Sequence, residues 1–303
     1  MSGPVVLLAG GTGGAKLARG LLDVAGAGLT VIANTGDDIE IHGGHVSPDP
    51  DLVTFWLADR IDERGWGLRD DTFTVMEGLR AVGEDVWFNL GDRDLALCLA
   101  RARRLAAGES LTEVTDDLRM AFGVRATVLP MSDDPVRTWI KTRGRWEPFQ
   151  EFMIRDRAEG PIGDVEFRGA AAAAPSQEAL AAIAGAGAVI VGPSNPVISI
   201  GPILALPGMR EALRDCPGRV LAVSPLVGGR SLKGPTEAFL AWAGQPPSSD
   251  GIVELYAGLL DGLVADERAS DLPTLETDVA MPDAAGRRRV AQETLQFALA
   301  LGG

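Results

Sequence analysis

The sequence predicts an α/β protein with a Rossmann-like, doubly wound, mainly parallel sheet in three layers and a mixed helical and antiparallel insertion. First, the apolar runs PVVLLAG and GLTVIANTG flank the helically spaced segment AKLARGLLDVAG, and together they span about 35 residues, the length of a parallel βαβ unit. Second, similar runs, AGAVIVG and GRVLAVS, return near the carboxyl end and alternate with helical segments that follow Ser176, Gly208 and Thr236. Third, the periodicity between these two regions differs, which indicates an insertion.

The insertion is expected to begin with helices. Apolar residues three or four positions apart predict helices at 51–62, 72–83, 93–108 and 110–123. One short strand, DVWFNLGD at 85–92, is expected to interrupt them.

An antiparallel unit is expected after these helices. From 126 to 168 the period shortens toward two in RATVLP, VRTWIKTRG, RWEPFQEFMIR and DVEFRG, and RGRW suits a hairpin turn. This pattern predicts an excursion from the main sheet. We therefore assign 1–48 and 170–303 to a nucleotide-binding core and 49–169 to an insertion that contributes to the substrate site, although 1–303 can also count as one domain.

Composition excludes several function classes. The apolar fraction is 46%, yet no uninterrupted apolar run reaches the roughly 18 residues of a membrane helix. The start, MSGPVVLLAG, lacks a basic segment and is typical of a strand, so we expect a cytoplasmic protein. The two cysteines, Cys98 and Cys216, lie far apart in apolar segments and are expected to be small core residues.

The formal charge of −14 opposes binding to nucleic acid or to an anionic membrane, because both attract proteins mainly through Lys and Arg. An anionic ligand must then be held by local donors or by a metal ion.

A glycine cluster follows the first predicted strand and opens the first predicted helix. It consists of Gly10, Gly11, Thr12, Gly13 and Gly14. Backbone N–H groups at the start of a helix can receive a phosphate, and glycine lets the ligand approach the backbone closely. The cluster is not a Walker sequence, because Ala15 and Leu17 flank Lys16, and the dinucleotide fingerprint fails because Asn34 stands where an acidic residue is needed. A plain tight turn is the alternative.

Carboxylates follow the second predicted strand and open the next helix. Asp37 and Asp38 lie in NTGDD, and Asp49 and Asp51 lie in SPDPDLVTFW. Adjacent carboxylates near a phosphate site repel the ligand unless a divalent cation lies between them, so we expect a metal here. Helix capping is the alternative for Asp51.

The only two histidines, His42 and His45, do not suffice for zinc or for a hydrolytic triad. Zinc needs more ligands than this pair, and a Ser-His-Asp triad is not favoured with no other histidine in the chain. We expect both to serve the structure of a loop or to support other side chains.

Three further strand ends carry polar residues. The first is NLGDRD, where Asp92 suits a helix cap and Arg93 suits a phosphate or an ionised phenol. The second is GPSNP, whose Ser194 and Asn195 suit a base-reading pocket, and the third is PLVGG with KGP behind it. Because the carboxyl ends of parallel strands meet at one edge, these segments are expected to converge there.

In this order and across nearly the whole chain, GGTGG, NTGDD, SPDPDLVTFW, GDRD, LPMSDDPVRTWI, FQEFMIR, GPSNPVISIGPIL and KGP resemble the 2-phospho-L-lactate transferase family of coenzyme F-420 biosynthesis. Bacterial members of that family use phosphoenolpyruvate-derived donors. The resemblance implies a Mg²⁺-dependent homodimer. It implies a donor that joins GMP through a pyrophosphate to phospholactate or enolpyruvate, and 7,8-didemethyl-8-hydroxy-5-deazariboflavin as acceptor. The transferred acid stays open between lactyl, enolpyruvyl and glyceryl.

The resemblance also implies roles for single residues. The glycine cluster would cradle the phosphates, and the nucleotide would be surrounded by Lys16, Ser194, Asn195, Pro196, Gly229 and Lys233. The deazaflavin would lie against Asp51, Asn89, Asp92 and Arg93. Asp37 and Asp51 would face the metal and act in catalysis, with Asp38 and Asp49 as alternative ligands. Which carboxylate accepts the hydroxyl proton is left open.

Two other function classes are kept as alternatives. A related fold serves as a non-enzymatic, nucleotide-sugar-binding regulator of carbon metabolism that also begins with a Gly-Gly-Thr-Gly turn. NTGDD, SPDPD and GDRD fit the transferase pattern better. A nicotinamide dehydrogenase is disfavoured by the failed fingerprint.

Overall fold

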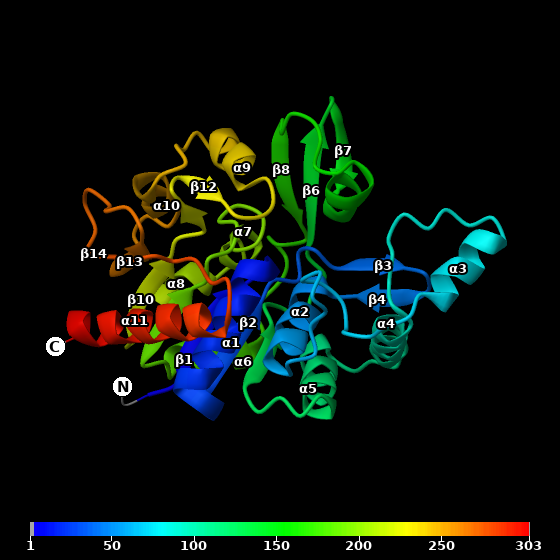
Figure 1. Ribbon diagram of the computed structural model, residues 1–303, viewed down its shortest axis with the longest axis horizontal. Coiled ribbons are helices and arrows are strands. Elements are labelled where there is room, and N and C mark those ends of the chain that lie inside the picture. Colours follow the sequence, from blue (N-terminus) through cyan, green and yellow to red (C-terminus); the bar gives the residue numbers. More distant parts are fainter. Residues whose placement is uncertain (1–2, 303) are drawn as a thin grey trace.

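The centre of the molecule is a seven-stranded, wholly parallel sheet in the order β14-β13-β10-β9-β1-β2-β5, seen in a computed structural model that describes residues 3–302 (Figure 1). Its strands are β1 (Val5–Ala9), β2 (Leu29–Ala33), β5 (Thr127–Pro130), β9 (Ala188–Val191), β10 (Arg219–Val223), β13 (Gly262–Ala265) and β14 (Thr274–Glu276). The chain leaves β1 toward β2 on one side and later returns as β9 on the other. The order of strands therefore reverses at β1 and β9, the place where such sheets bind ligands.

Helices cover both faces of the sheet and make three layers, as the sequence predicts. They are α1 (Gly11–Ala25), α2 (Pro48–Leu57), α3 (Thr74–Ala81), α4 (Asp92–Ala106), α5 (Leu111–Ala121), α6 (Gln177–Ala184), α7 (Gly201–Leu204), α8 (Met209–Arg214), α9 (Thr236–Trp242), α10 (Ser249–Leu255) and α11 (Ala284–Gly302). Successive residues of β1 alternate between two cores. Leu7 packs with α1, α2 and α11, whereas Leu8 packs with α6, α7 and α8.

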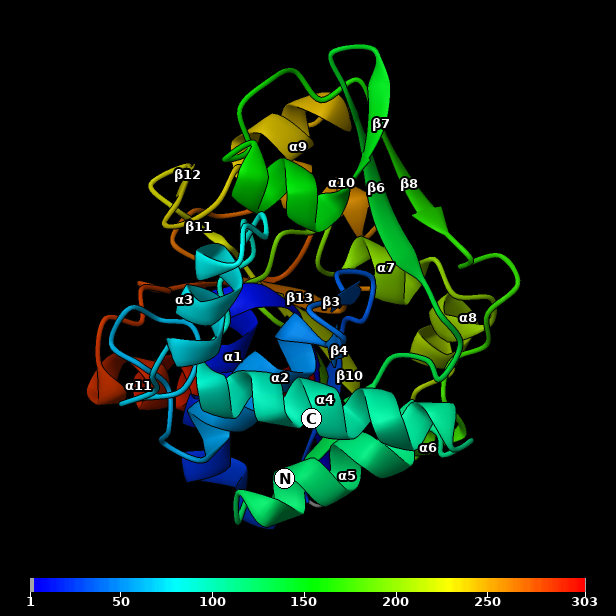
Figure 2. The ribbon, with the colours of Figure 1, turned by 90° about the vertical axis from the view of Figure 1, so that its right-hand side faces the viewer.

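Three small antiparallel sheets surround the carboxyl edge of the main sheet. They are formed by β3 (Ile39–Ile41) with β4 (Gly44–Val46), by β6 (Arg137–Thr142) with β7 (Arg145–Pro148) and β8 (Asp164–Arg168), and by β11 (Leu226–Val227) with β12 (Arg230–Ser231). The β6 unit projects beyond the main sheet (Figure 1), and α4 and α5 lie side by side on the outside (Figure 2). None of the helices within residues 3–302 is both long and apolar enough to cross a membrane.

Three expected elements are corrected. RATVLP does not join the antiparallel unit, because β5 pairs in parallel with β2 and places Val128 and Leu129 in opposite cores. No strand forms at 85–92, where Phe88 and Leu90 pack into a small core with α3 and α4. FQEFMIR is helical and contains a π-helix (Glu151–Arg155), which packs Phe149 and Phe152 on one side. A short apolar run is too short for its periodicity to distinguish a strand from a helix or a packed loop.

Candidate active site

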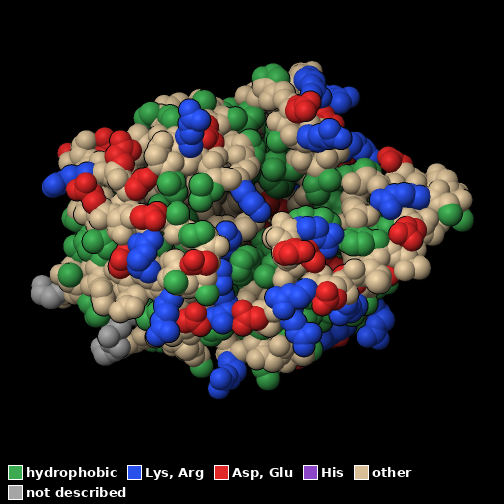
Figure 3. Space-filling view, viewed as in Figure 1, with side chains coloured by type: hydrophobic (Ala, Val, Ile, Leu, Met, Phe, Trp, Pro, Cys, Tyr) green, Lys and Arg blue, Asp and Glu red, His purple; other side chains and the backbone are tan. Residues whose placement is uncertain are grey.

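Two cavities of about 460 Å³ each lie at the carboxyl edge of the sheet and share part of their walls. We call one the glycine cavity, because its floor is Gly10, Gly11, Thr12 and Gly13. The other is the aromatic cavity, named for its walls of Phe55, Trp66, Trp87 and Phe88. The shared wall is formed by Pro48, Asp49 and Gln150. The surface is hollowed near the middle of this face, with basic side chains at the rim (Figure 3).

The glycine cluster is a tight turn that packs against the loop after β9. Gly11 has a φ of +61°, and a Cβ on Gly13 would lie 1.9 Å from the carbonyl oxygen of Pro193. Gly14 is buried behind the cavity against Ala9. The N–H of Gly11 donates to Asp49 at 2.6 Å. Because the first N–H groups of a helix lack partners within it, those of Thr12 and Gly13 are available to a ligand.

Replacing Gly13 by alanine should push the start of α1 away from the loop after β9. We expect nucleotide affinity to fall at least about tenfold and the free energy of unfolding to fall by about 1–3 kcal/mol, as for other overpacked sites. Isothermal titration with GDP and urea unfolding measure the two effects. Gly78→Ala is the matched control, because this helical glycine has open space around it and should gain slight stability. Unchanged GDP affinity in Gly13→Ala would contradict this role of the turn.

Asp37 and Asp49 form the acidic side of the glycine cavity. Burial, and then the charge of Asp49, raise the pKa of Asp37 well above its ordinary value. Burial also raises the pKa of Asp49, to about 6, although hydrogen bonds from Gly11 and Asn34 act to lower it. Among the described residues, Oδ1 of Asp37 is buried without a hydrogen-bond partner. A hard divalent cation satisfies such an oxygen and removes the repulsion between the carboxylates, so the site fits Mg²⁺.

Asp38 differs from its neighbour because its oxygens are already engaged. It accepts hydrogen bonds from His45 at 2.9 Å and from Ser47 at 2.8 Å. Burial lowers the pKa of His45, but hydrogen bonds to Asp38 and Glu40 outweigh burial and raise this pKa to about 9. The other histidine, His42, contacts the carbonyl oxygen of Phe88 at 2.8 Å. Both histidines thus stabilise the β3–β4 hairpin and its surroundings.

Lys16 and Lys233 also line the glycine cavity and give it a basic component. Burial lowers the pKa of Lys16, and the charges of Lys233 and Arg287 lower it further. A ligand with several negative charges relieves the repulsion among these cations, whereas the carboxylates require a metal ion. The combination suits a diphosphate with a bound cation.

The loop after β9 contributes further predicted residues. Ser194 accepts a hydrogen bond from the N–H of Gly10 at 3.2 Å, and Asn195 accepts from Val197 at 3.0 Å. Both line the glycine cavity, where four of the five strand ends predicted to converge meet; the exception is NLGDRD, whose Asn89 and Asp94 line the aromatic cavity. Two predicted residues, Pro196 and Gly229, are outside its lining.

Asp51 lies apart from Asp37, its predicted partner at a metal, but it lines the same cavity as Asn89, its predicted partner at the deazaflavin. Its carboxylate is buried and receives two hydrogen bonds from Arg101, whose side chain is 1% exposed. It therefore faces an arginine and lines the aromatic cavity, away from Asp37. The geometry favours Asp37 with Asp49 as the carboxylates near a metal.

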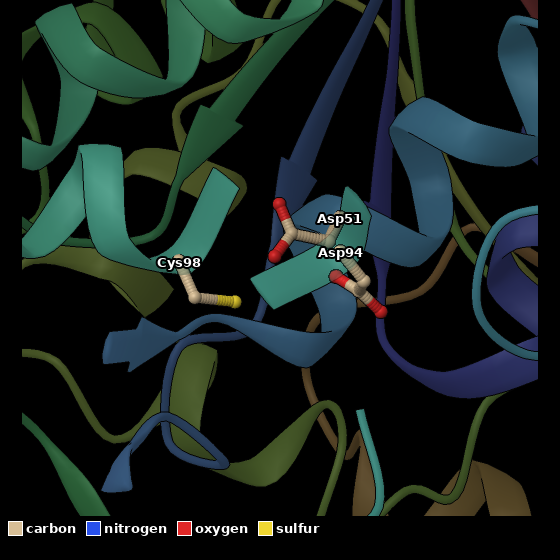
Figure 4. Close-up of side chains that lie close together, drawn as sticks. All are labelled: Asp51, Asp94 and Cys98. Atoms are coloured by element: carbon tan, nitrogen blue, oxygen red, sulfur yellow. The ribbon is translucent and has the colours of Figure 1, made fainter. Parts of the chain in front are cut away.

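Asp51, Asp94 and Cys98 place their ligand atoms within 4.8 Å of one another (Figure 4). This cluster does not suit a cation, because Arg101 already supplies a positive charge at Asp51. In addition, burial raises the pKa of the Cys98 thiol, so sulfur stays protonated and ligates metals poorly.

Two residues of GDRD, Asp92 and Arg93, lie outside the lining of the aromatic cavity, and their contact with the deazaflavin stays a prediction. Asp92 accepts hydrogen bonds from the N–H groups of Thr74 and Val75, and so caps the N-terminus of α3. Arg93 is exposed and bonds to the backbone of Asp70. Asn89 does line the cavity. The next acidic residue, Asp94, lines it as well.

Burial, and then the charge of Asp51, raise the pKa of Asp94 to about 7. The unfolded chain loses this proton near the ordinary value of 3.8, so the stability of the folded state falls as pH rises from about 4 through 7. Asp94→Asn lacks this penalty. We expect the variant to exceed the wild type at pH 8 by on the order of a few kcal/mol in urea unfolding, with a gap that shrinks toward pH 5. A gap independent of pH would contradict the burial effect.

Several wall residues carried no sequence signal of their role. Gln150 lies in a segment expected to be a strand, and Trp66 lies in a loop where Gly65 and Gly67 both have positive φ. The pattern Gly-Trp-Gly could have indicated a tryptophan presented by a tight turn. Arg101 lies behind the wall, where it bonds to Asp51, and nothing in the sequence links it to a residue 50 positions away.

Comparison with known proteins identifies the family of the chain. The chain matches the family profile described as 2-phospho-L-lactate transferase CofD over residues 5–295. It is 41% identical over 266 residues to a 2-phospho-L-lactate transferase of Methanosarcina mazei, covering 87% of each chain. It is 42% identical over 297 residues to a phosphoenolpyruvate transferase of Thermobifida fusca, covering 92% of this chain and 91% of the relative.

Among solved structures, a UPF0052 family protein of Bacillus halodurans matches with a TM-score of 0.64 at 17% identity. The match covers 97% of this chain and 99% of the other. At this identity the similarity shows a common fold.

Proposed function

Because the chain belongs to the 2-phospho-L-lactate transferase CofD family, and is therefore a transferase of coenzyme F-420 biosynthesis, we propose the following reaction for it. It moves a phosphorylated three-carbon acid from a guanylylated diphosphate to 7,8-didemethyl-8-hydroxy-5-deazariboflavin and releases GMP. The donor is lactyl-2-diphospho-5'-guanosine or enolpyruvoyl-2-diphospho-5'-guanosine. The observation that supports this proposal most is the pair of cavities that meet at Asp49 and Gln150.

The glycine cavity suits the donor. It offers N–H groups at the start of α1, two lysines and two buried carboxylates, which together match a diphosphate with a divalent cation. Ser194, Asn195 and Thr236 supply hydrogen-bonding groups on the same wall for the nucleoside. Donor and cation therefore occupy one cavity.

The aromatic cavity suits the acceptor. A deazaflavin ring is planar and mostly apolar, and it stacks well on tryptophan and phenylalanine faces. Trp66 lies at the mouth, 43% exposed, while Phe55 is buried. A ring bound here can direct its ribityl chain to the wall that the two cavities share.

In the proposed step the terminal ribityl hydroxyl attacks the phosphorus next to the three-carbon acid. A new P–O bond forms, the bond from this phosphorus to the bridging oxygen breaks, and GMP leaves with the bonding electrons. Asp49 lines both cavities and so lies where the acceptor hydroxyl would meet the donor, and we assign the hydroxyl proton to it. Asp37 would hold Mg²⁺, which when bound supplies the charge neutralisation that phosphoryl transfer needs.

Gln150 would position the attacking hydroxyl. Its Nε2 donates to the backbone oxygen of Asp37 at 3.0 Å, so the amide is oriented with Oε1 left as an acceptor. The glycine-cluster N–H groups would orient the diphosphate. Positioning of this kind supplies much of the rate enhancement in phosphoryl transfer.

Mass spectrometry of the product tests the proposal. The protein is incubated with Mg²⁺, the deazaflavin and, in turn, the lactyl, enolpyruvyl or glyceryl donor. We expect the acceptor to gain one phosphorylated three-carbon acid, with release of one GMP. Binding of GDP with no product from any of the three donors would support a non-enzymatic nucleotide-binding regulator instead.

A further inference from the structure

Asp94 is a buried acid that no other residue satisfies. It lies in the first turn of α4, is 8% exposed and lines the aromatic cavity. Within residues 3–302, its carboxyl oxygens accept no hydrogen bond. Asp51 beside it has Arg101 as a partner, but Arg101 bonds to Asp51 and to the backbone of His45.

The surroundings of Asp94 make a carboxyl without a hydrogen bond unusual. The cavity walls are mainly aromatic and aliphatic, and burial together with the charge of Asp51 raises the pKa of the Asp94 carboxyl. A carboxyl that opens onto a mainly apolar cavity and accepts no hydrogen bond from the protein is ready to accept one from a ligand. A ligand that brings a donor into the cavity supplies one.

We infer that Asp94 recognises the ring of the acceptor by accepting a hydrogen bond from a ring imide N–H. The inference rests on the proposed function, because it takes the aromatic cavity as the acceptor site. A deazaflavin ring offers two donors, an imide N–H between two carbonyls and a phenolic hydroxyl. The phenol ionises readily, and its negative charge would meet the carboxyls of Asp51 and Asp94, so the imide edge is the better match.

The inference makes Asp94 a specificity residue for planar heterocycles that carry this imide edge. The aromatic walls accept many flat rings, since stacking discriminates little among them. A single buried acceptor discriminates strongly, because a ring without a donor leaves the carboxyl unpaired.

The test compares two variants with two acceptors. Wild type, Asp94→Ala and Asp94→Asn are assayed with the deazaflavin and with its imide N-methyl analogue, by steady-state kinetics and by fluorescence titration of acceptor binding. We expect Asp94→Ala to raise the acceptor KM and Kd at least about tenfold, with the donor KM within twofold of wild type. Asp94→Asn should stay within about threefold, because its amide oxygen still accepts a hydrogen bond.

The analogue separates recognition from a structural effect. N-methylation should weaken acceptor binding to the wild type by the same factor as Asp94→Ala, and should weaken binding to Asp94→Ala no further. Cys98→Ala is the control, since it alters the same helix without removing the carboxyl, and its acceptor Kd should match the wild type.

Two results would overturn the inference. One is a folded Asp94→Ala variant whose acceptor Kd is unchanged. The other is an N-methyl effect of equal size in wild type and Asp94→Ala, which would show that Asp94 does not contact the imide. The fluorescence titration needs no donor and no turnover, so it tests Asp94 even if the proposed transfer fails.

Discussion

Replacing Asp37 by asparagine should lower turnover by on the order of a thousandfold while leaving the fold intact. The reason is that Asp37 has the buried oxygen without a partner, and it stands beside Asp49 in the glycine cavity. An asparagine keeps the size but not the charge that attracts a divalent cation. The kcat at saturating donor measures the loss, and calorimetric titration of Mg²⁺ into the protein with GDP should show weakened metal binding.

Asp70→Asn is a suitable control for the Asp37 variant. Asp70 is exposed and has a φ of +55°, a conformation that asparagine adopts as readily. It should retain wild-type turnover and Mg²⁺ affinity. Near-normal activity of Asp37→Asn at low Mg²⁺ would refute the assignment of Asp37 to the metal.

Replacing Arg101 by methionine should lower the free energy of unfolding by about 3–5 kcal/mol, the usual cost of leaving one member of a buried ion pair uncompensated. Arg101 is 1% exposed and makes hydrogen bonds to Asp51 and to the backbone of His45. Methionine fills similar space but leaves the Asp51 charge buried. Urea unfolding followed by circular dichroism measures the loss.

A second substitution identifies the cause. Arg101→Met combined with Asp51→Asn removes both charges and should recover a large part of the lost stability. If the double variant were as unstable as Arg101→Met alone, lost packing of the arginine stem would be the better explanation. If Arg101→Met cost less than about 1 kcal/mol, the pair would not stabilise this part of the fold.

The main sheet and the glycine cavity could be predicted because their signals are local. A buried strand, a glycine turn and an amphipathic helix lie next to one another in the sequence, and the parallel topology then brings the ends of β1 and β9 together. Asp37, Ser194 and Lys233 follow such strand ends or the loops behind them, and all three line the predicted cavity.

The aromatic cavity could not be predicted in the same way. Much of its wall comes from the loop around Trp66, the irregular segment that contains Trp87 and the helical segment that contains Ile154. None of these directly follows a strand of the main sheet. Only tertiary packing brings them together. The sequence pattern placed Trp87 on a strand, because a short apolar run has the same composition in a strand and in a packed loop.

The separation of Asp51 from Asp37 could not be predicted for a related reason. From the sequence it is one of several carboxylates at a helix start, and its partner Arg101 is far along the chain. A carboxylate with a buried arginine and one with an unpartnered oxygen look alike until both are seen folded. Asp94 was not predicted as a site residue. It lies in GDRD, where Arg93 beside it was expected to contact the ligand.

The most direct test is a crystal structure of the protein with GDP, Mg²⁺ and the deazaflavin. Our account places the diphosphate at the N–H groups of Thr12 and Gly13, the cation at Asp37, and the ring against Trp66 and Trp87 with its ribityl chain toward Asp49. A nucleotide bound far from Gly13, or a ring outside the cavity lined by Trp87, would contradict it.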